Sequence, residues 1–116
     1  MAEAPFQYSG LDRLFHERAR LGIATALAAH PEGLPFTALR DLVGLTDGNL
    51  NRHLKVLVDE GCAVVEKDRR QGRARTRVAL TAAGRARFQA YLEALEAALR
   101  EAVAAAAAAD PSSAPA

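Results

Sequence analysis

Arginine, the side chain best suited to binding phosphates, is concentrated in one stretch of this 116-residue chain. Between Lys67 and Arg87 there are eight basic residues and one acid, Asp68, whereas the rest of the chain has seven basic and thirteen acidic residues. Thirteen of the fifteen basic residues are Arg, whose planar guanidinium forms paired hydrogen bonds to phosphates and base edges. The formal net charge of +1 therefore hides one strongly positive segment, for which a polyanion is the natural partner. The alternative is an Arg-rich solvated surface.

A second group of polar side chains, at residues 46–55, has the types that read DNA bases. The amide of Asn49 matches the edge of adenine, and the guanidinium of Arg52 matches guanine. Asp47 has two open interpretations: it accepts a hydrogen bond from cytosine, or it interacts favourably with the dipole of a helix that begins there. Contacts to phosphate or sugar are expected from Thr46, Asn51 and Lys55.

Helices must position these groups. The apolar spacing predicts a helix over residues 11–29, a short extended piece at 33–35 and a brief helix from Phe36 to Val43, which Gly44 ends. Thr46 is a good N-cap for a third helix that runs to Glu60. The apolar stripe of that helix is formed by Leu50, Leu54, Leu57 and Val58. Its opposite face carries Gly48, Asn49, Arg52, Lys55, Val56 and Asp59.

A basic hairpin is expected next. Gly61 supplies a left-handed cap, and the pattern then changes to that of a strand over residues 62–69. After a turn at 70–73, the return strand alternates, with Thr76, Val78 and Leu80 on one face and Arg73, Arg75 and Arg77 on the other. We expect Arg70 and Arg73, at the hairpin tip, to suit a narrow minor groove.

Thr81 caps the final helix, whose apolar stripe runs from Phe88 to Val103, farther than a small domain needs to cover its own core. A stripe of this length on a terminal helix indicates a partner. Residues 1–9 contain Pro5 and lack periodicity, which predicts a flexible arm, and residues 104–116 predict a low-complexity tail that frays. One domain over residues 10–103 is therefore expected.

The order of helix, helix, tight turn, helix, basic hairpin and helix predicts a mainly α fold with a small β-hairpin (α+β). This is a winged helix-turn-helix, with residues 46–60 in the major groove and residues 69–75 on the backbone or in the minor groove. Residues 11–91 also resemble the winged-helix transcriptional regulators of the MarR and ArsR groups of bacteria. The resemblance is carried by the segments LDRLFHERARLGIATAL, LTDGNLNRHLKVLVDEG and LTAAGRARF.

That resemblance implies a homodimeric repressor or activator, with a repressor favoured, that binds a pseudo-palindromic operator in double-stranded DNA. The residues at its recognition positions are Asp47, Gly48, Asn49, Arg52 and His53, and the wing is formed by residues 69–75, including Arg69. The first and last helices form the dimer interface, and an effector pocket, where one exists, is built from the same two helices. The interface residues are Leu11, Leu14, Phe15, Phe88, Tyr91, Leu92, Leu95 and Leu99.

Isolated reactive side chains favour packing roles. Cys62 is the one cysteine, which excludes an internal disulfide and a thiolate cluster, and its default place is a buried strand start rather than an oxidation switch. His16 is expected to pack as a polar residue, with a pH or metal role as the alternative, and His53 to bridge core and DNA rather than bind a metal. Interface packing is favoured over an effector pocket for Tyr8 and Tyr91. No metal site and no cofactor are expected.

No nucleotide-binding, metalloprotease or nucleophile-elbow pattern occurs in the chain, so we do not expect an enzyme. No apolar run is long enough to span a membrane, and residues 1–10 do not have the pattern of a signal peptide, so a cytoplasmic protein is expected. The rival function is a protein–protein interaction module whose wing arginines bind an acidic partner. The short polar side chains that begin the third helix argue against it, because protein-binding faces are usually apolar at their centre.

Overall fold

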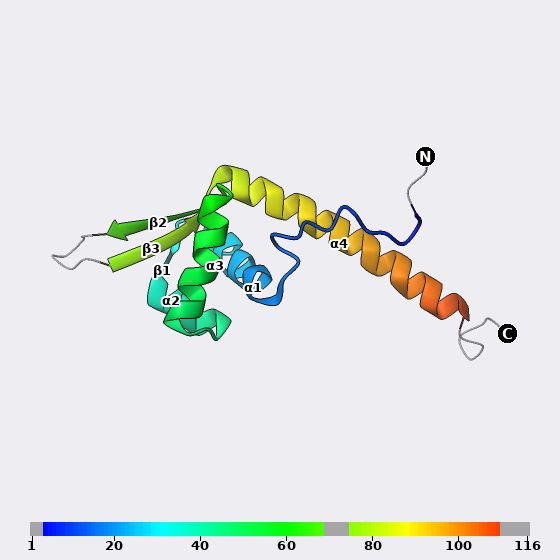
Figure 1. The fold of residues 1–116 in the computed structure, drawn as a ribbon, viewed down its shortest axis with the longest axis horizontal. Helices are drawn as coiled ribbons and strands as arrows, with labels where there is room; N and C mark the ends of the chain where they lie inside the picture. The colour runs from blue at the N-terminus through cyan, green and yellow to red at the C-terminus, as the bar shows by residue number, and fades with distance from the viewer. Residues whose placement is uncertain (1–3, 69–74, 110–116) are drawn as a thin grey trace.

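The computed structural model describes residues 4–68 and 75–109, which form four helices and a three-stranded sheet (Figure 1). This arrangement confirms the predicted winged helix-turn-helix with a long C-terminal helix. In chain order the elements are α1 (Arg18–Ala28), β1 (Leu34–Pro35), α2 (Phe36–Val43), α3 (Asp47–Asp59), β2 (Ala63–Asp68), β3 (Arg75–Leu80) and α4 (Ala82–Ala109).

The sheet is antiparallel with the strand order β1-β3-β2. In the hairpin, Ala63 lies opposite Leu80, and the extended piece predicted at 33–35 adds a third strand in which Leu34 lies opposite Val78. Arg77 alternates with the buried Val78 as predicted, but it is partly buried. Its guanidinium donates to the carbonyls of Glu32 and Gly33, at 3.2 and 3.3 Å, and so ties β3 to the segment that enters β1.

The first helix begins at Arg18 and not at the predicted residue 11. Residues 11–17 form turns instead, and the carboxylate of Asp12 accepts a hydrogen bond from the backbone N–H of Leu14 at 3.0 Å. Glu17 then caps α1, because its two carboxylate oxygens accept from the N–H groups of Ala19 and Arg20, at 3.1 and 2.8 Å. A side-chain acceptor at this position satisfies amides that have no partner inside the helix.

The core lies where α1, α3, the sheet and the first half of α4 meet. Its aromatic part is a cluster of three rings, in which the centroid of Phe15 lies 5.0 Å from that of Phe88 and 5.9 Å from that of Tyr91. Aliphatic side chains complete the core, and the fully buried ones include Ile23, Leu27, Leu39, Leu50, Leu57 and Val78. The helices that carry the predicted DNA-reading residues are therefore anchored to one continuous apolar cluster.

The C-terminal helix α4 projects beyond this body (Figure 1). It has 28 residues, about 42 Å of helix, yet its buried residues are Gly84, Phe88 and Tyr91, all in its first half. The described residues have a radius of gyration of 18.4 Å, against about 13 Å for a compact domain of this length. The helix is continuous and exposed from residue 101 to Ala109, so the fraying predicted from residue 104 is not seen within the described part of the chain.

The described part of the N-terminal arm, residues 4–10, lies beside α4 (Figure 1). A shallow hollow between them is lined by Tyr8, Gly10 and Leu11 from the N-terminal side and by Ala94 and Ala98 from α4. Among the described residues, no helix combines the length and hydropathy required of a membrane span.

Candidate nucleic-acid interface

The start of α3 is fixed by local interactions. The hydroxyl of Thr46 accepts a hydrogen bond from the backbone N–H of Asn49 at 3.2 Å, which confirms Thr46 as the N-cap. Gly44, with φ at +67°, makes the left-handed turn that ends α2 two residues earlier. The tight turn between α2 and α3 therefore depends on a glycine and a cap that were both predicted from the sequence.

The predicted polar face of α3 is exposed. Asn49, Asn51 and Arg52 are all open to solvent, and among the described residues their side chains have no hydrogen-bond or ion-pair partner, so they are free to contact a ligand. Lys55, one turn further, donates to Asp59 at 2.9 Å. The buried side of α3 carries Leu50, Leu54 and Leu57 as predicted. Val58 was placed in that stripe wrongly, because it is 40% exposed.

Asp47 has a partner that neither interpretation of its role included. One of its carboxylate oxygens accepts from Arg40 of α2 at 2.9 Å, and the same guanidinium donates to Asp41 at 3.0 Å. These two carboxylates raise the pKa of Arg40 above its usual value. Asp47 also lies in the first turn of α3, where a negative charge is favoured by the helix dipole. The ion pair holds the carboxylate of Asp47 toward α2, across the turn of the helix-turn-helix.

His53 does not lie on the exposed face of α3 with Asn49 and Arg52, which corrects its predicted place among the DNA-contacting residues. It is 6% exposed and lies on the same side of α3 as Leu50 and Leu57. Its Nδ1 lies 3.1 Å from a terminal nitrogen of Arg20 and 3.8 Å from Glu17 Oε2, both contributed by the start of α1. Burial is the largest cause of the lowered pKa of His53, the nearby carboxylate of Glu17 opposes it, and the positive charges of Arg52 and Arg20 add to it.

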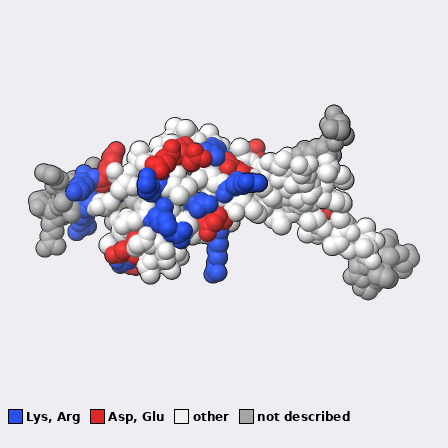
Figure 2. Space-filling model, viewed as in Figure 1, with Lys and Arg blue, Asp and Glu red and all other residues white. Residues whose placement is uncertain are grey.

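The wing is described only at its base. Arg69, Arg70 and Arg73 lie outside the described residues, whereas Arg75 begins β3 and is exposed, with no ion-pair partner among the residues that the structure describes. A hollow beside Arg75 is also lined by Thr76 and by Thr37 of α2. Figure 2 shows charged side chains gathered over the helical body and at the base of the wing, and few over the far half of α4.

Half of the predicted dimer-interface residues belong to the core of a single chain. Leu14, Phe15, Phe88 and Tyr91 are at most 6% exposed, so they have almost no surface left for a second chain. Phe88 and Tyr91 lie on the part of the α4 stripe that packs into the core of its own chain, and Leu14 and Phe15 lie in the turns of the same core. Leu11 and Leu95 are partly buried, and the side chains that remain available are Leu92, Leu99 and Val103, which are 36%, 57% and 66% exposed.

Of the isolated reactive residues, Cys62 is a packing residue as expected, whereas His16 is exposed. Cys62 is buried at the turn before β2, and burial raises the pKa of its thiol, which disfavours the reactive thiolate. His16 Nδ1 lies 2.8 Å from the hydroxyl of Tyr91, and burial likewise raises the pKa of that phenol. No three His, Cys, Asp or Glu side chains come together as a metal site within residues 4–68 and 75–109.

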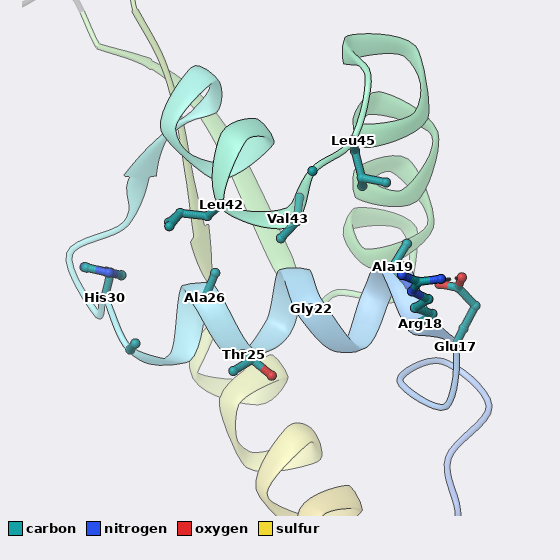
Figure 3. Close-up of a pocket in the computed structure, with 12 residues that line it drawn as sticks. Glu17, Arg18, Ala19, Gly22, Thr25, Ala26, His30, Leu42, Val43 and Leu45 are labelled. Carbon is teal, nitrogen blue, oxygen red and sulfur yellow. Dashed lines mark hydrogen bonds between the residues drawn. The ribbon is translucent and has the colours of Figure 1, made fainter.

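A groove runs between α1 and α2 (Figure 3). Its floor is the small residues Gly22 and Ala26 of α1, and its opposite wall is formed by Leu42 and Val43. Glu17 and Arg18 lie at one end, and His30 lies at the other. Gly22 allows this close approach, since a Cβ there would already touch Val43 at 3.7 Å.

The comparisons with known proteins agree with this geometry. The family described as the winged helix DNA-binding domain matches residues 19–99, which span α1, the helix-turn-helix, the wing and most of α4. The chain belongs to the winged helix DNA-binding domain family. It is a family of DNA-binding domains and not of enzymes, as the absence of catalytic patterns predicted.

Among relatives, the chain is 35% identical to an uncharacterized protein of Methanocaldococcus jannaschii over 80 residues, which cover 69% of this chain and 86% of the relative. Among solved structures, it is similar to a transcriptional regulator homologue of Pyrococcus horikoshii, with 29% identity, a TM-score of 0.73 and coverage of 78% of this chain and 88% of that one.

The fold is also that of MarR-family regulators. A MarR-family transcriptional regulator of Silicibacter pomeroyi has a TM-score of 0.61 at 24% identity, with coverage of 91% of this chain and 70% of that one. The MepR–DNA complex of S. aureus has a TM-score of 0.66 at 17% identity, with coverage of 84% and 78%. The MarR resemblance is thus confirmed at the level of fold. The predicted bacterial origin stays a prediction, because the similar proteins come from archaea as well as bacteria.

Proposed function

We propose that this protein is a transcriptional regulator that reads a specific DNA sequence by placing α3 in the major groove. The observation that carries the proposal is the free polar face of α3, where Asn49 and Arg52 are exposed on a helix that is capped at its start and buried along its other side. An α-helix fits the major groove, and amide and guanidinium groups distinguish adenine and guanine there. The family to which the chain belongs supports the same function.

In this proposal the wing contributes affinity rather than sequence selectivity. Lys67 and Arg75 are exposed at the base of the wing, and Arg69, Arg70 and Arg73 lie between them in the sequence. Arginines of this kind neutralise phosphates and enter narrow minor grooves. Thr37 and Thr76 beside Arg75 add hydroxyl donors for the backbone.

The proposed active form is a homodimer that represses transcription from a pseudo-palindromic operator. The support is the projecting half of α4, which exposes Leu99 and Val103 and has little of its own chain to pack against. Helices in proteins gain most of their stability from packing an apolar face, and the projecting half of α4 has no such packing in a single chain. A second copy of α4 would supply it. A two-fold dimer would place two copies of α3 on half-sites about one helical turn apart.

Capture of genomic DNA fragments by the purified protein at about 0.15 M salt, followed by sequencing, tests the proposal. We expect enrichment of one motif with two-fold symmetry. Retention of fragments without any shared motif would contradict sequence-specific reading. It would favour the rival function, in which the basic wing binds an acidic protein, and the same purified protein would then retain acidic protein partners in place of a DNA motif.

A further inference from the structure

Three charged or titratable side chains join the recognition helix to the start of α1. His53 comes from α3, and Glu17 and Arg20 come from the first turn of α1. Arg20 is itself held firmly, because its Nε donates to the carbonyl of Leu14 at 2.7 Å. Its terminal Nη1 then lies 3.1 Å from His53 Nδ1 and 3.8 Å from Glu17 Oε2. We call Glu17, Arg20 and His53 the α1–α3 joint.

The hydrogen bond between Arg20 and His53 requires a neutral imidazole. A guanidinium has donors and no acceptor, so His53 Nδ1 must be the acceptor and the ring proton must lie on Nε2. When His53 gains a second proton, Nδ1 becomes a donor that faces another donor. The hydrogen bond is then lost, and two positive charges are left at hydrogen-bond distance, with the His53 ring buried and the Arg20 guanidinium partly exposed.

Within the described residues, the carboxylate near a protonated His53 is that of Glu17, and pairing with it disturbs α1. Glu17 Oε2, 3.8 Å from Nδ1, is the oxygen that accepts from the backbone N–H of Arg20 at 2.8 Å. A move of this carboxylate toward His53 weakens the N-cap of α1. Arg52 directly precedes His53 on α3. A shift of His53 therefore also moves Arg52, the side chain that we propose reads a base.

We propose that the α1–α3 joint positions the recognition helix, and that high-affinity DNA binding by the proposed interface requires the neutral form of His53. This inference rests on the proposed function and adds its regulation by pH. The charged groups that face His53 within the described residues are Glu17 and Arg20 from α1 and Arg52 from α3 itself. The lowered pKa of His53, caused first by burial, agrees with a neutral ring at pH 7 and with loss of that state in acid.

The test compares DNA affinity across pH for three proteins: the wild type, His53→Gln, and His30→Gln as a matched control. The glutamine that replaces His53 keeps a side-chain oxygen acceptor for Arg20 and cannot be protonated. His30 is half-exposed at the far end of α1, beside Glu32. The probe is a duplex selected from a random library at pH 7.5, with a shuffled duplex for comparison. Affinity is measured by fluorescence anisotropy from pH 7.5 to 5.0 at constant ionic strength.

We expect the wild type and His30→Gln to lose affinity for the selected duplex below pH 6.5, by at most about tenfold per pH unit. His53→Gln should bind within about threefold of the wild type at pH 7.5 and stay nearly constant. The shuffled duplex should be bound no more weakly in acid, because protonation adds positive charge to the protein. A flat wild-type profile, or a His53→Gln profile that falls like the wild type, would overturn the inference.

A second measurement covers the case in which His53→Gln does not fold. The ring protons of His53 are titrated by NMR in the wild-type protein, free and bound to the selected duplex. Reciprocal linkage requires that DNA binding lower the pKa of His53, and an unchanged pKa would overturn the inference. Failure to select any duplex at pH 7.5 would instead contradict the proposed function itself, so the two failures are distinguishable.

Discussion

At the scale of residues, the candidate interface is predictable where helical periodicity alone decides exposure. Asn49 and Arg52 are separated from the buried Leu50 and Leu54 as a 3.6-residue period requires, and both are exposed. The same period already places His53 on the buried side, three residues after Leu50 and four before Leu57. Because histidine is polar, His53 was predicted to face DNA. In the structure it is buried, and its ring nitrogen is hydrogen-bonded to Arg20. That partner, Arg20, is 33 residues away, which no local pattern reveals.

Replacement of Arg52 by Ala is expected to weaken binding to the captured motif by about 1–3 kcal/mol, because one base-edge contact is lost. Binding to unrelated duplexes should change much less. Competition binding against a panel of single-base variants measures the effect and should show relaxed selectivity at one position of each half-site. The matched control is Arg13→Ala, which removes an exposed arginine in the turns before α1. An equal loss in both variants would contradict base reading by Arg52.

The stability of the fold should also depend on pH through His53. Its pKa is lowered in the folded state, so the unfolded chain binds more protons below the unfolded pKa of about 6.5. The contribution of neutral His53 is therefore fully present above pH 6.5 and is lost as the pH falls through the folded pKa. Urea unfolding at pH 7.5 and 5.5 should show a larger fall in midpoint for the wild type than for His53→Gln. Equal falls would mean that His53 is not the titrating group.

At the scale of elements, helix ends were predicted well where a glycine or a hydroxyl marks them. Gly44, Thr46 and Thr81 all occupy the predicted positions, and Thr81 accepts from the N–H of Gly84 at 2.8 Å. The start of α1 was misplaced because the apolar spacing continues through the turns at residues 11–17. The pairing of β1 with β3 was not predicted. Two residues, Leu34 and Pro35, are too few to show a strand period, and their partners in β3 lie more than forty residues away.

The start of α4 is the most tightly packed junction between elements. A Cβ on Gly84 would overlap the backbone carbonyl of Cys62, which also accepts from the N–H of Thr81 at 2.9 Å. The atom that a Cβ on Gly84 would meet belongs to the backbone, so it cannot rotate out of the way as a side chain can. We expect Gly84→Ala to destabilise the protein by about 3 kcal/mol, at the upper end for overpacking. Urea unfolding measures the loss. Gly48→Ala is the control, since a Cβ at that helical position meets nothing within 4 Å. Comparable stability of both variants would contradict the close contact.

The wing should act through charge. Removing the exposed guanidinium of Arg75 is expected to weaken binding to all duplexes alike and to reduce the salt slope of the affinity by about one. The dependence of log Kd on log salt concentration, measured for the captured motif and for a shuffled duplex, gives this slope. Arg100→Ala, on the far half of α4 and paired with Glu96, serves as the control and should leave the slope unchanged. If the Arg75→Ala variant has the same salt slope as the wild type, Arg75 does not contact DNA.

At the scale of the whole molecule, the elongated shape divides α4 into a half that packs on the body and a half that is exposed. The described residues extend over 68 Å in one direction and 23 Å in another, because the far half of α4 leaves the body. The sequence predicts that α4 needs a partner, but it cannot distinguish the part of the stripe that fills its own core from the part that remains exposed. That division depends on how far the N-terminal turns and α1 reach along α4, which is a property of the assembled fold.

Placing acids in the exposed stripe should separate the proposed dimer into single chains. We expect Leu99→Glu combined with Val103→Glu to halve the solution mass in light scattering and to abolish tight binding to a duplex with two half-sites. The matched control is Ala105→Glu, which adds a negative charge on a different side of the exposed helix. If the double variant still has the mass of two chains, the dimer interface does not include Leu99 and Val103. If the wild type has the mass of one chain, the proposed homodimer is contradicted.

The most direct test of sequence-specific reading by α3 uses the captured motif itself. Wild-type affinity at about 0.15 M salt is measured for the motif and for duplexes with one base pair changed at each position in turn. We predict losses of about 1–3 kcal/mol at a few positions, arranged symmetrically in two half-sites about one helical turn apart. Equal affinity for every changed duplex would show that the protein binds DNA by charge alone and would contradict the account.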